Sequence, residues 1–134
     1  MSKISISITG ELTYKTGCNF ILISTQNIMY AEYQDEACTI VLSDGVKHII
    51  YCSLKELLTY LPPYFISISR NTMINLKFIK SIHKSHVVLH PEIVIEISTR
   101  KHRMLIKKML INEKYTENTV LRKNAYPLKL NAYP

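Results

Sequence analysis

A central stretch decides the fold of this chain: Phe65-Ile66-Ser67-Ile68-Ser69-Arg70-Asn71-Thr72-Met73-Ile74-Asn75. Its first half alternates apolar and polar residues, which predicts a half-buried β-strand with Ile66 and Ile68 on one face. The alternation ends in Arg70 and Asn71, so we expect these polar side chains to stand at the end of a strand. Side chains held at the rim of a rigid scaffold are commonly functional.

Most of the surrounding sequence also predicts β-strands. Short runs rich in β-branched and aromatic residues fit a pleated, half-buried surface better than a helix. The Asp44-Gly45 pair between two such runs predicts a tight hairpin turn. We therefore expect a mainly β fold with minor α content. The predicted strands are residues 4–8, 20–23 (a short buried run), 39–42, 46–52, 78–82, 86–89 and 93–97.

Two helices interrupt the strands. The first is predicted at about residues 54–61, where Ser53 and Glu56 form a capping-box pattern and Pro62-Pro63 ends the helix. The second is predicted at about residues 99–111, with Ser98 as its N-cap. Its expected buried side consists of Leu105, Ile106, Met109 and Leu110.

The length of 134 residues suits a single domain with one ordinary core. The formal net charge is +7, and its distribution is uneven. Residues 67–108 carry nine Lys or Arg side chains against only two acidic ones, whereas residues 1–66 carry four basic and six acidic side chains. A concentration of positive charge in one segment favours a polyanionic partner.

The start of the second predicted helix is the expected binding site for such a polyanion. Its first turn holds Arg100, Lys101 and Arg103, where the helix macrodipole favours acidic residues. An anion reverses this mismatch, because unpaired backbone N–H groups, the dipole and three basic side chains then act together. Arginine can also bind guanine O6 and N7 in a bidentate manner. The segment therefore predicts a phosphate site, with arginine able to bind either a phosphate or a guanine edge.

Several ordered motifs together resemble a LytTR DNA-binding domain, over roughly residues 19–110. They are Tyr30-Ala31-Glu32, Asp44-Gly45, Ser53-Leu54-Lys55-Glu56-Leu57, Leu61-Pro62 before Phe65, Ile68-Ser69-Arg70-Asn71 up to Asn75, and Ile97-Ser98-Thr99-Arg100. The resemblance implies an elongated arrangement of small antiparallel sheets. It also implies that loops, rather than a recognition helix, enter the major groove of double-stranded DNA.

By position, the resemblance places base-reading sites at Glu36-Ala37, Arg70 and Arg100. Of these we assign base readout to Arg70 and Arg100, and a first-loop contact to Glu36 and Ala37. Contact with the DNA backbone is assigned to Asn71, Ser98, Thr99, Lys101 and Arg103. The chain departs from the family pattern Arg-Ile-His-Arg-Ser, because Ser69 replaces the histidine and Asn71 the serine.

The expected organisation has three parts: an N-terminal extension at residues 1–18 that forms an edge strand, the DNA-binding domain at 19–111, and an extended or flexible tail at 112–134. An exposed edge strand provides a contact for a homodimer, and pairing within the domain is the alternative. We expect no receiver domain, so constitutive activity, control by abundance and regulation by a separate partner protein are three open hypotheses. No membrane segment or export signal is visible, which predicts a cytoplasmic protein.

Metal binding, cofactor binding and catalysis are not expected. Cys18, Cys38 and Cys52 lack metal-ligand spacing and are predicted to be reduced, mostly buried thiols. His83, His86 and His90 lie in strand-like sequence, with no carboxylate cluster to complete a site. The chain also has no glycine-rich phosphate loop and no recognisable pairing of a nucleophile with a base, so we predict that it is not an enzyme.

Two other functions compete with specific DNA binding. A protein-interaction module or anti-activator on the same fold is the main alternative, because the acidic first loop repels a phosphate backbone. An RNA-binding module also fits the charge, but such modules usually display aromatic residues for base stacking. The basic segment contains only Phe78.

Overall fold

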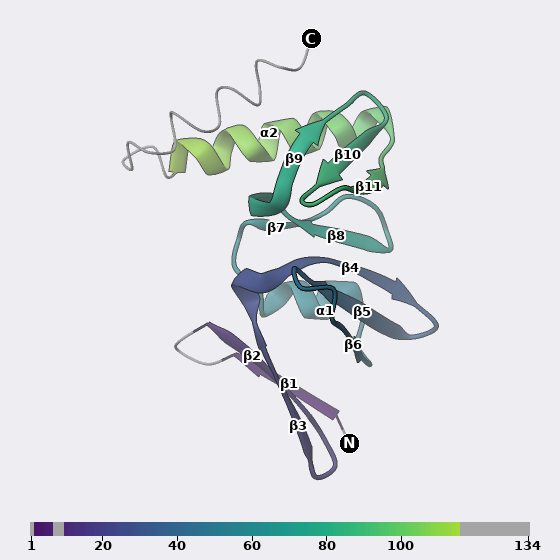
Figure 1. The fold of residues 1–134 in the computed structure, drawn as a ribbon, viewed down its shortest axis with the longest axis vertical. Helices are drawn as coiled ribbons and strands as arrows, with labels where there is room; N and C mark the ends of the chain where they lie inside the picture. The colour runs from purple at the N-terminus through teal and green to yellow at the C-terminus, as the bar shows by residue number, and fades with distance from the viewer. Residues whose placement is uncertain (1, 7–9, 116–134) are drawn as a thin grey trace. The chain divides into compact units, whose positions relative to one another are not determined.

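The computed structural model describes residues 2–6 and 10–115, whose fold is mainly β with two α-helices (Figure 1). The described strands form three antiparallel sheets, which confirms the predicted fold class. The chain divides into two compact units, Met1–Asn75 and Leu76–Pro134. The length alone predicted one ordinary core. Each described strand pairs only with strands of its own unit, however, so each unit builds its own sheets.

The first sheet of unit 1 contains β1 (Ser2–Ile6), β2 (Glu11–Thr16) and β3 (Asn19–Ser24), in the order β1-β2-β3. Its inner face buries Ile4, Leu12, Tyr14 and Ile23. The strand β1 lies at an edge of this sheet and pairs with β2 within the chain. The turn between β2 and β3 crosses the boundary predicted at residue 18, so this sheet joins the N-terminal extension to the segment after it.

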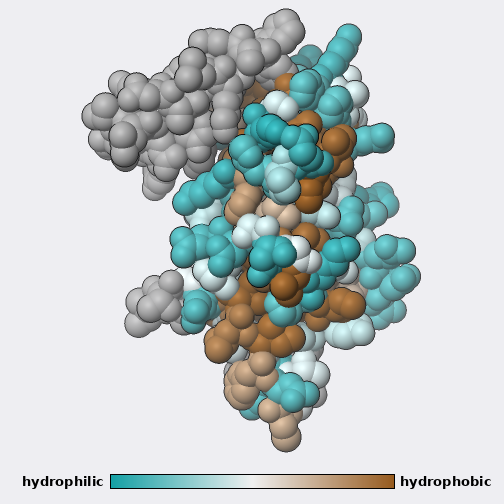
Figure 2. Space-filling model, in the orientation of Figure 1, coloured by the Kyte–Doolittle hydropathy of each residue, from teal (hydrophilic) through white to brown (hydrophobic). Residues whose placement is uncertain are grey.

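Two predictions for this sheet were wrong. Residues 20–23 were predicted to be a buried run, yet Phe20 and Leu22 are 63% and 64% exposed. They alternate with the inner-face residues of β3, and hydrophobic side chains reach the surface over this sheet (Figure 2). Cys18 lies in the β2–β3 turn and is exposed, whereas Cys38 and Cys52 are buried as predicted.

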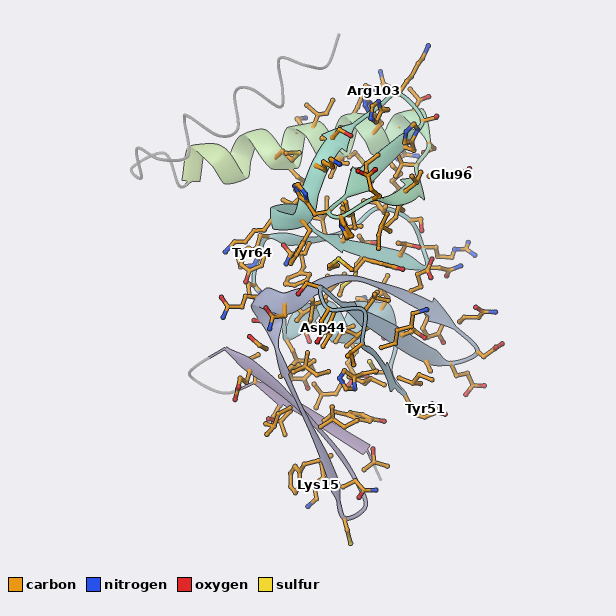
Figure 3. All side chains as sticks on the ribbon, viewed as in Figure 1. Lys15, Asp44, Tyr51, Tyr64, Glu96 and Arg103 are labelled. Carbon is orange, nitrogen blue, oxygen red and sulfur yellow. The ribbon has the colours of Figure 1, made fainter. Side chains whose placement is uncertain are left out.

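The second sheet of unit 1 has the strand order β6-β5-β4-β8-β7. Its strands are β4 (Ile28–Gln34), β5 (Ala37–Leu42), β6 (Lys47–Ile50), β7 (Phe65–Ser67) and β8 (Thr72–Asn75). The predicted hairpin turn joins β5 to β6. Gly45 has φ +90° there, and Asp44, labelled in Figure 3, accepts a 3.0 Å hydrogen bond from the Val46 N–H. A left-handed φ favours glycine at this position.

The helix α1 (Leu54–Thr59) starts as the capping pattern predicted. The Ser53 Oγ accepts a 3.0 Å hydrogen bond from the Glu56 N–H. The helix ends two residues earlier than expected, with Tyr60 as its C-cap. Leu57 is fully buried and belongs to one hydrophobic cluster with Ile40, Phe65 and Met73. Burial of a leucine side chain stabilises a fold by about 1.5–3 kcal/mol, so this cluster anchors the second sheet.

The described part of unit 2 contains a three-stranded sheet, one α-helix and a short 3-10 helix. The 3-10 helix η1 (Thr25–Asn27) belongs to unit 1, and unit 2 begins with η2 (Leu76–Phe78), followed by β9 (Ile79–Ile82), β10 (His86–Leu89), β11 (Ile93–Glu96) and α2 (Thr99–Tyr115). The strand order is β11-β10-β9. Val87, Leu89 and Leu105 are at most 1% exposed, so strand and helix residues both contribute buried side chains.

The helix α2 is longer than predicted. It continues to Tyr115, so the first four residues of the predicted tail at 112–134 are helical. Neither glycine nor proline occurs near residue 111 to end the helix. Residues 116–134 lie outside the described part of the chain. On the predicted buried side, Leu105 and Met109 are buried and Ile106 is half-buried, while the side chain of Leu110 is not among those described.

Candidate nucleic-acid interface

In unit 1, the site residues gather at one end of the five-stranded sheet. The strands β4 and β8 are antiparallel, and Glu32 is the partner of Thr72. The end of β4 therefore lies beside the start of β8. This register brings the β4–β5 turn and the β7–β8 loop to the same end of the sheet (Figure 1).

The β7–β8 loop holds Arg70 at its tip through a set of short hydrogen bonds. The Ser67 hydroxyl donates to the Ser69 carbonyl at 2.6 Å, and the Asn71 N–H donates to the Ser69 Oγ at 3.2 Å. The Tyr33 N–H donates to the Asn71 carbonyl at 2.7 Å, which ties the loop to β4. Ile68, at 2% exposed, anchors the loop in the core.

Arg70 and Asn71 are both exposed on this braced loop. No ion pair to Arg70 occurs among the residues that the structure describes. A guanidinium presents five donors in a planar fork, and the braced backbone limits the entropy lost when that fork binds. The loop is thus suited to bidentate recognition of a guanine edge or a phosphate.

The neighbouring β4–β5 turn has an unusual backbone. Asp35 and Glu36 have φ values of +53° and +66°, and Gln34 pairs with Ala37 across them. This is the geometry of a two-residue turn with both central residues left-handed, which usually contains Asn-Gly or Asp-Gly. Both acidic residues are exposed, whereas Ala37 is only 7% exposed. The surface of the expected first-loop contact therefore consists of Asp35 and Glu36, and the Ala37 methyl group is not available.

In unit 2, the site residues lie at the start of α2. The Ser98 Oγ accepts from the Lys101 N–H at 3.3 Å, and the Ser98 carbonyl accepts from the His102 N–H at 2.8 Å. Ser98 is therefore the N-cap. Because the first N–H groups of an α-helix have no intrahelical acceptor, one cap leaves further donors at this end. These donors and the positive end of the macrodipole favour an anion at the helix start.

The side chains around this helix start are basic and accessible. Arg100 and Arg103 are exposed, Thr99 is exposed, and Lys101 is half-buried, while the first turn contains no acidic residue. Figure 3 labels Arg103 on α2 and Glu96 on β11. Burial lowers the pKa of His102, which favours its neutral form, so the positive charge at the helix start comes from arginine and lysine.

The β9–β10 turn is a neighbour of the helix start that the sequence did not associate with it. His86 pairs with Glu96 across β10 and β11, and the Ile97 N–H donates to the Ser85 carbonyl at 2.8 Å. The turn and the residues that lead into α2 therefore share one end of the sheet. In the sequence, this turn is marked only by a basic residue, Lys84, between two strand-like runs. Its proximity to Ser98 depends on the register of the strands.

The described residues contain no group of three or more His, Cys, Asp or Glu side chains that could hold a metal ion. His83 and His86 stack on each other, with ring centroids 4.5 Å apart. The Cys38 thiol donates to the Cys52 carbonyl at 3.5 Å. A hydrogen bond with Cys38 and burial raise the pKa of Cys52, which keeps it a thiol and makes it a poor metal ligand. Within the same part of the chain, no helix is long and apolar enough to cross a membrane.

Comparisons with known proteins agree with this geometry. The family model described as the LytTr DNA-binding domain matches residues 19–110. Among solved structures, the chain is similar to one described as the LytTr DNA-binding domain of a methyl-accepting/DNA response regulator from Bacillus cereus, with a TM-score of 0.63 and 21% identity. That match covers 75% of this chain and 96% of the other, and at this identity it concerns the fold. A search of curated proteins found no match.

Proposed function

The chain belongs to the LytTR family of DNA-binding domains, and from this premise we propose that it regulates transcription by binding double-stranded DNA in a sequence-specific manner. The family is one of DNA-binding domains and not of enzymes. The observation that carries the proposal is the start of α2, where the Ser98 cap, free backbone donors and three basic side chains converge without an acidic residue.

Two kinds of contact are proposed. Arg70 and Arg100 read base edges in the major groove, preferably guanine, because arginine can bind O6 and N7 together. Asn71, Ser98, Thr99, Lys101 and Arg103 hold the sugar-phosphate backbone and fix the position of the arginines. Ile68 and Ile97 are buried, and they precede the Arg70 loop and the start of α2, respectively. Both groups of proposed contact residues therefore start from a backbone that is anchored in a core.

The test starts with selection of binding sites from a random duplex library, followed by fluorescence anisotropy on the selected and a scrambled duplex. Arg100→Ala is expected to reduce the preference for the selected site by about 1–3 kcal/mol. Lys101→Ala is expected to weaken binding to both duplexes equally. Equal losses on the two duplexes for both Arg70→Ala and Arg100→Ala would overturn base readout.

Salt dependence provides an independent check. With roughly five to seven phosphate contacts per protomer, a plot of log K against log salt should have a slope of about −4 to −6. A flat plot would contradict binding to a DNA backbone altogether.

A second candidate function rests on the acidic β4–β5 turn. Asp35 and Glu36 are exposed at the same sheet end as Arg70, and two carboxylates repel a phosphate backbone. This favours a protein-interaction module or anti-activator that keeps the fold without specific DNA binding. Library selection separates the two, because an anti-activator yields no enriched sequence. A carboxylate that accepts from cytosine N4 would instead give a selected site with cytosine opposite the turn.

Assembly on DNA is a further part of the proposal. The strand β1 lies at an edge of its sheet, with no further strand beside it among the described residues, and an unpaired edge is a site for pairing with a second copy. Paired half-sites in the selected library would support a homodimer on DNA, and light scattering coupled to size-exclusion chromatography would give its mass. Control by a separate regulatory protein is also proposed, and co-purification with a tagged chain tests it.

A further inference from the structure

The β9–β10 turn is held by hydrogen bonds and a ring stack, and it carries an exposed cation, Lys84. The His83 N–H donates to the His86 carbonyl at 2.8 Å, and the Ser81 Oγ lies 2.8 Å from the His83 Nε2. The two imidazole rings stack at an interplanar angle of 15°. Lys84, between the two histidines, is exposed and has no ion-pair partner among the residues that the structure describes.

This turn lies next to the proposed backbone clamp at the start of α2. The Ile97 N–H donates to the Ser85 carbonyl at 2.8 Å, and Ser98, the N-cap of α2, is the next residue in the chain. The cross-strand pair of His86 and Glu96 lies at the same end of the sheet. Glu96 is the one acidic side chain of β11, and its cross-strand partner is His86. Glu96 forms no ion pair with Lys84 among the described residues, so the charge of Lys84 is available for another partner.

The opposite end of the same sheet differs. There the Lys80 ammonium donates to the Glu92 carboxylate and to the Pro91 carbonyl. This pairing lowers the pKa of Glu92, as expected for a carboxylate beside a cation. Lys80 lies within β9, whereas Lys84 lies in the turn that follows this strand. Lys80 is thus paired with a carboxylate, whereas Lys84, near the helix start, has no ion-pair partner in the described part of the chain.

We propose that the β9–β10 turn is an additional DNA-backbone element, in which Lys84 contacts a phosphate and the His83–His86 stack together with Ser85 fixes the position of the turn. This inference rests on the proposed function, because it extends the backbone clamp of Ser98 and Lys101. It adds a contact from a strand turn to those from the helix. The contact carries no sequence information, so it changes affinity and not base preference.

The experiment measures DNA binding of the full chain by fluorescence anisotropy between 50 and about 300 mM salt, on the selected and the scrambled duplex. Lys84→Ala removes one phosphate contact and should reduce the slope of log K against log salt by about 0.9. If this contribution vanishes near 1 M salt, the loss at 0.1 M is about eightfold, and it is equal on both duplexes. Lys84→Glu should lower the affinity further.

Lys80→Ala is the matched control, because it removes the same charge from the same sheet at its other end. It should leave the slope within about 0.3 of the wild-type value. Equal effects of Lys84→Ala and Lys80→Ala would overturn the inference while leaving the proposed function in place. If the wild-type chain shows no salt-dependent binding to duplex DNA, both the inference and the proposed function fail.

Discussion

Ser98 allows the stability of α2 and the binding of phosphate to be tested separately. Its Oγ accepts from the Lys101 N–H at 3.3 Å, a longer bond than the usual 2.9–3.0 Å, and the site is exposed. Replacement of an N-cap serine by alanine costs about 0.5–2 kcal/mol, and this geometry places Ser98→Ala in the lower half of that range. For a chain of 134 residues, a loss of about 0.5–1 kcal/mol lowers Tm by about 2–4 °C.

Ser98→Asp should give the opposite pattern. An aspartate is an equally good N-cap, and its charge interacts favourably with the helix dipole by about 0.3–1 kcal/mol, so stability should equal or exceed that of wild type. The same charge would face a bound phosphate. Two unit charges about 4 Å apart repel by about 1 kcal/mol even in bulk water, so the affinity for DNA should decrease at least about fivefold.

Urea denaturation and anisotropy on the same preparations of Ser98→Ala and Ser98→Asp give both quantities. A Ser98→Asp variant that is stable and binds DNA as tightly as wild type would show that no phosphate approaches the helix start. If Ser98→Asp is instead as unstable as Ser98→Ala, the cap assignment is wrong. Measurements at low and high salt separate charge repulsion from a change in loop shape, since only the repulsion is screened.

Three further substitutions test the fold of unit 1. Leu57→Ala removes a fully buried side chain from the core cluster and should cost about 2–5 kcal/mol, measured by urea denaturation with an unchanged m-value. Glu36→Gly replaces a residue at φ +66° and should raise the unfolding free energy by about 0.5–1 kcal/mol; a loss of stability there would contradict the assigned turn. Asn75→Ala removes the buried donor that binds the Ile28 carbonyl at 2.8 Å and should cost about 1–3 kcal/mol, whereas a change near zero would show that water replaces it.

The parts of the fold that follow from local chemistry were predictable from the sequence. Alternation around Ile66 predicted a strand, which is β7, although Ile68 lies beyond its end and Phe65 is buried as well as Ile66. Ser53 predicted the start of α1, and the Asp44-Gly45 pair predicted a hairpin. Each of these features depends on residues within a few positions of one another. Local propensity and hydrogen bonding determine such features without a contact between distant parts of the chain.

Features that depend on strand register, or on which face of a strand is buried, could not be predicted from the sequence. A run such as Phe20-Ile21-Leu22-Ile23 is apolar on both faces, and only the structure reveals that Phe20 and Leu22 are exposed. The left-handed turn at Asp35 and Glu36 contains no glycine, which is the usual sequence signal for such a turn. The position of Lys84 near Ser98 requires the pairing of β10 with β11, which no local pattern encodes.

The replacement of a histidine by Ser69 has a structural consequence within the Arg70 loop. The Ser69 hydroxyl accepts from the Asn71 N–H, its carbonyl accepts from the Ser67 hydroxyl, and its N–H donates to the Thr72 carbonyl, so all three polar groups of this residue brace the loop. A side chain engaged in this way does not extend to a base as an imidazole can. Base readout in unit 1 then depends on Arg70, which is held between Ile68 in the core and Asn71, whose carbonyl accepts from the Tyr33 N–H of β4. Because the flanking Asp35 and Glu36 oppose a phosphate, this loop should contribute more to sequence preference than to affinity, and the affinity should come mainly from unit 2.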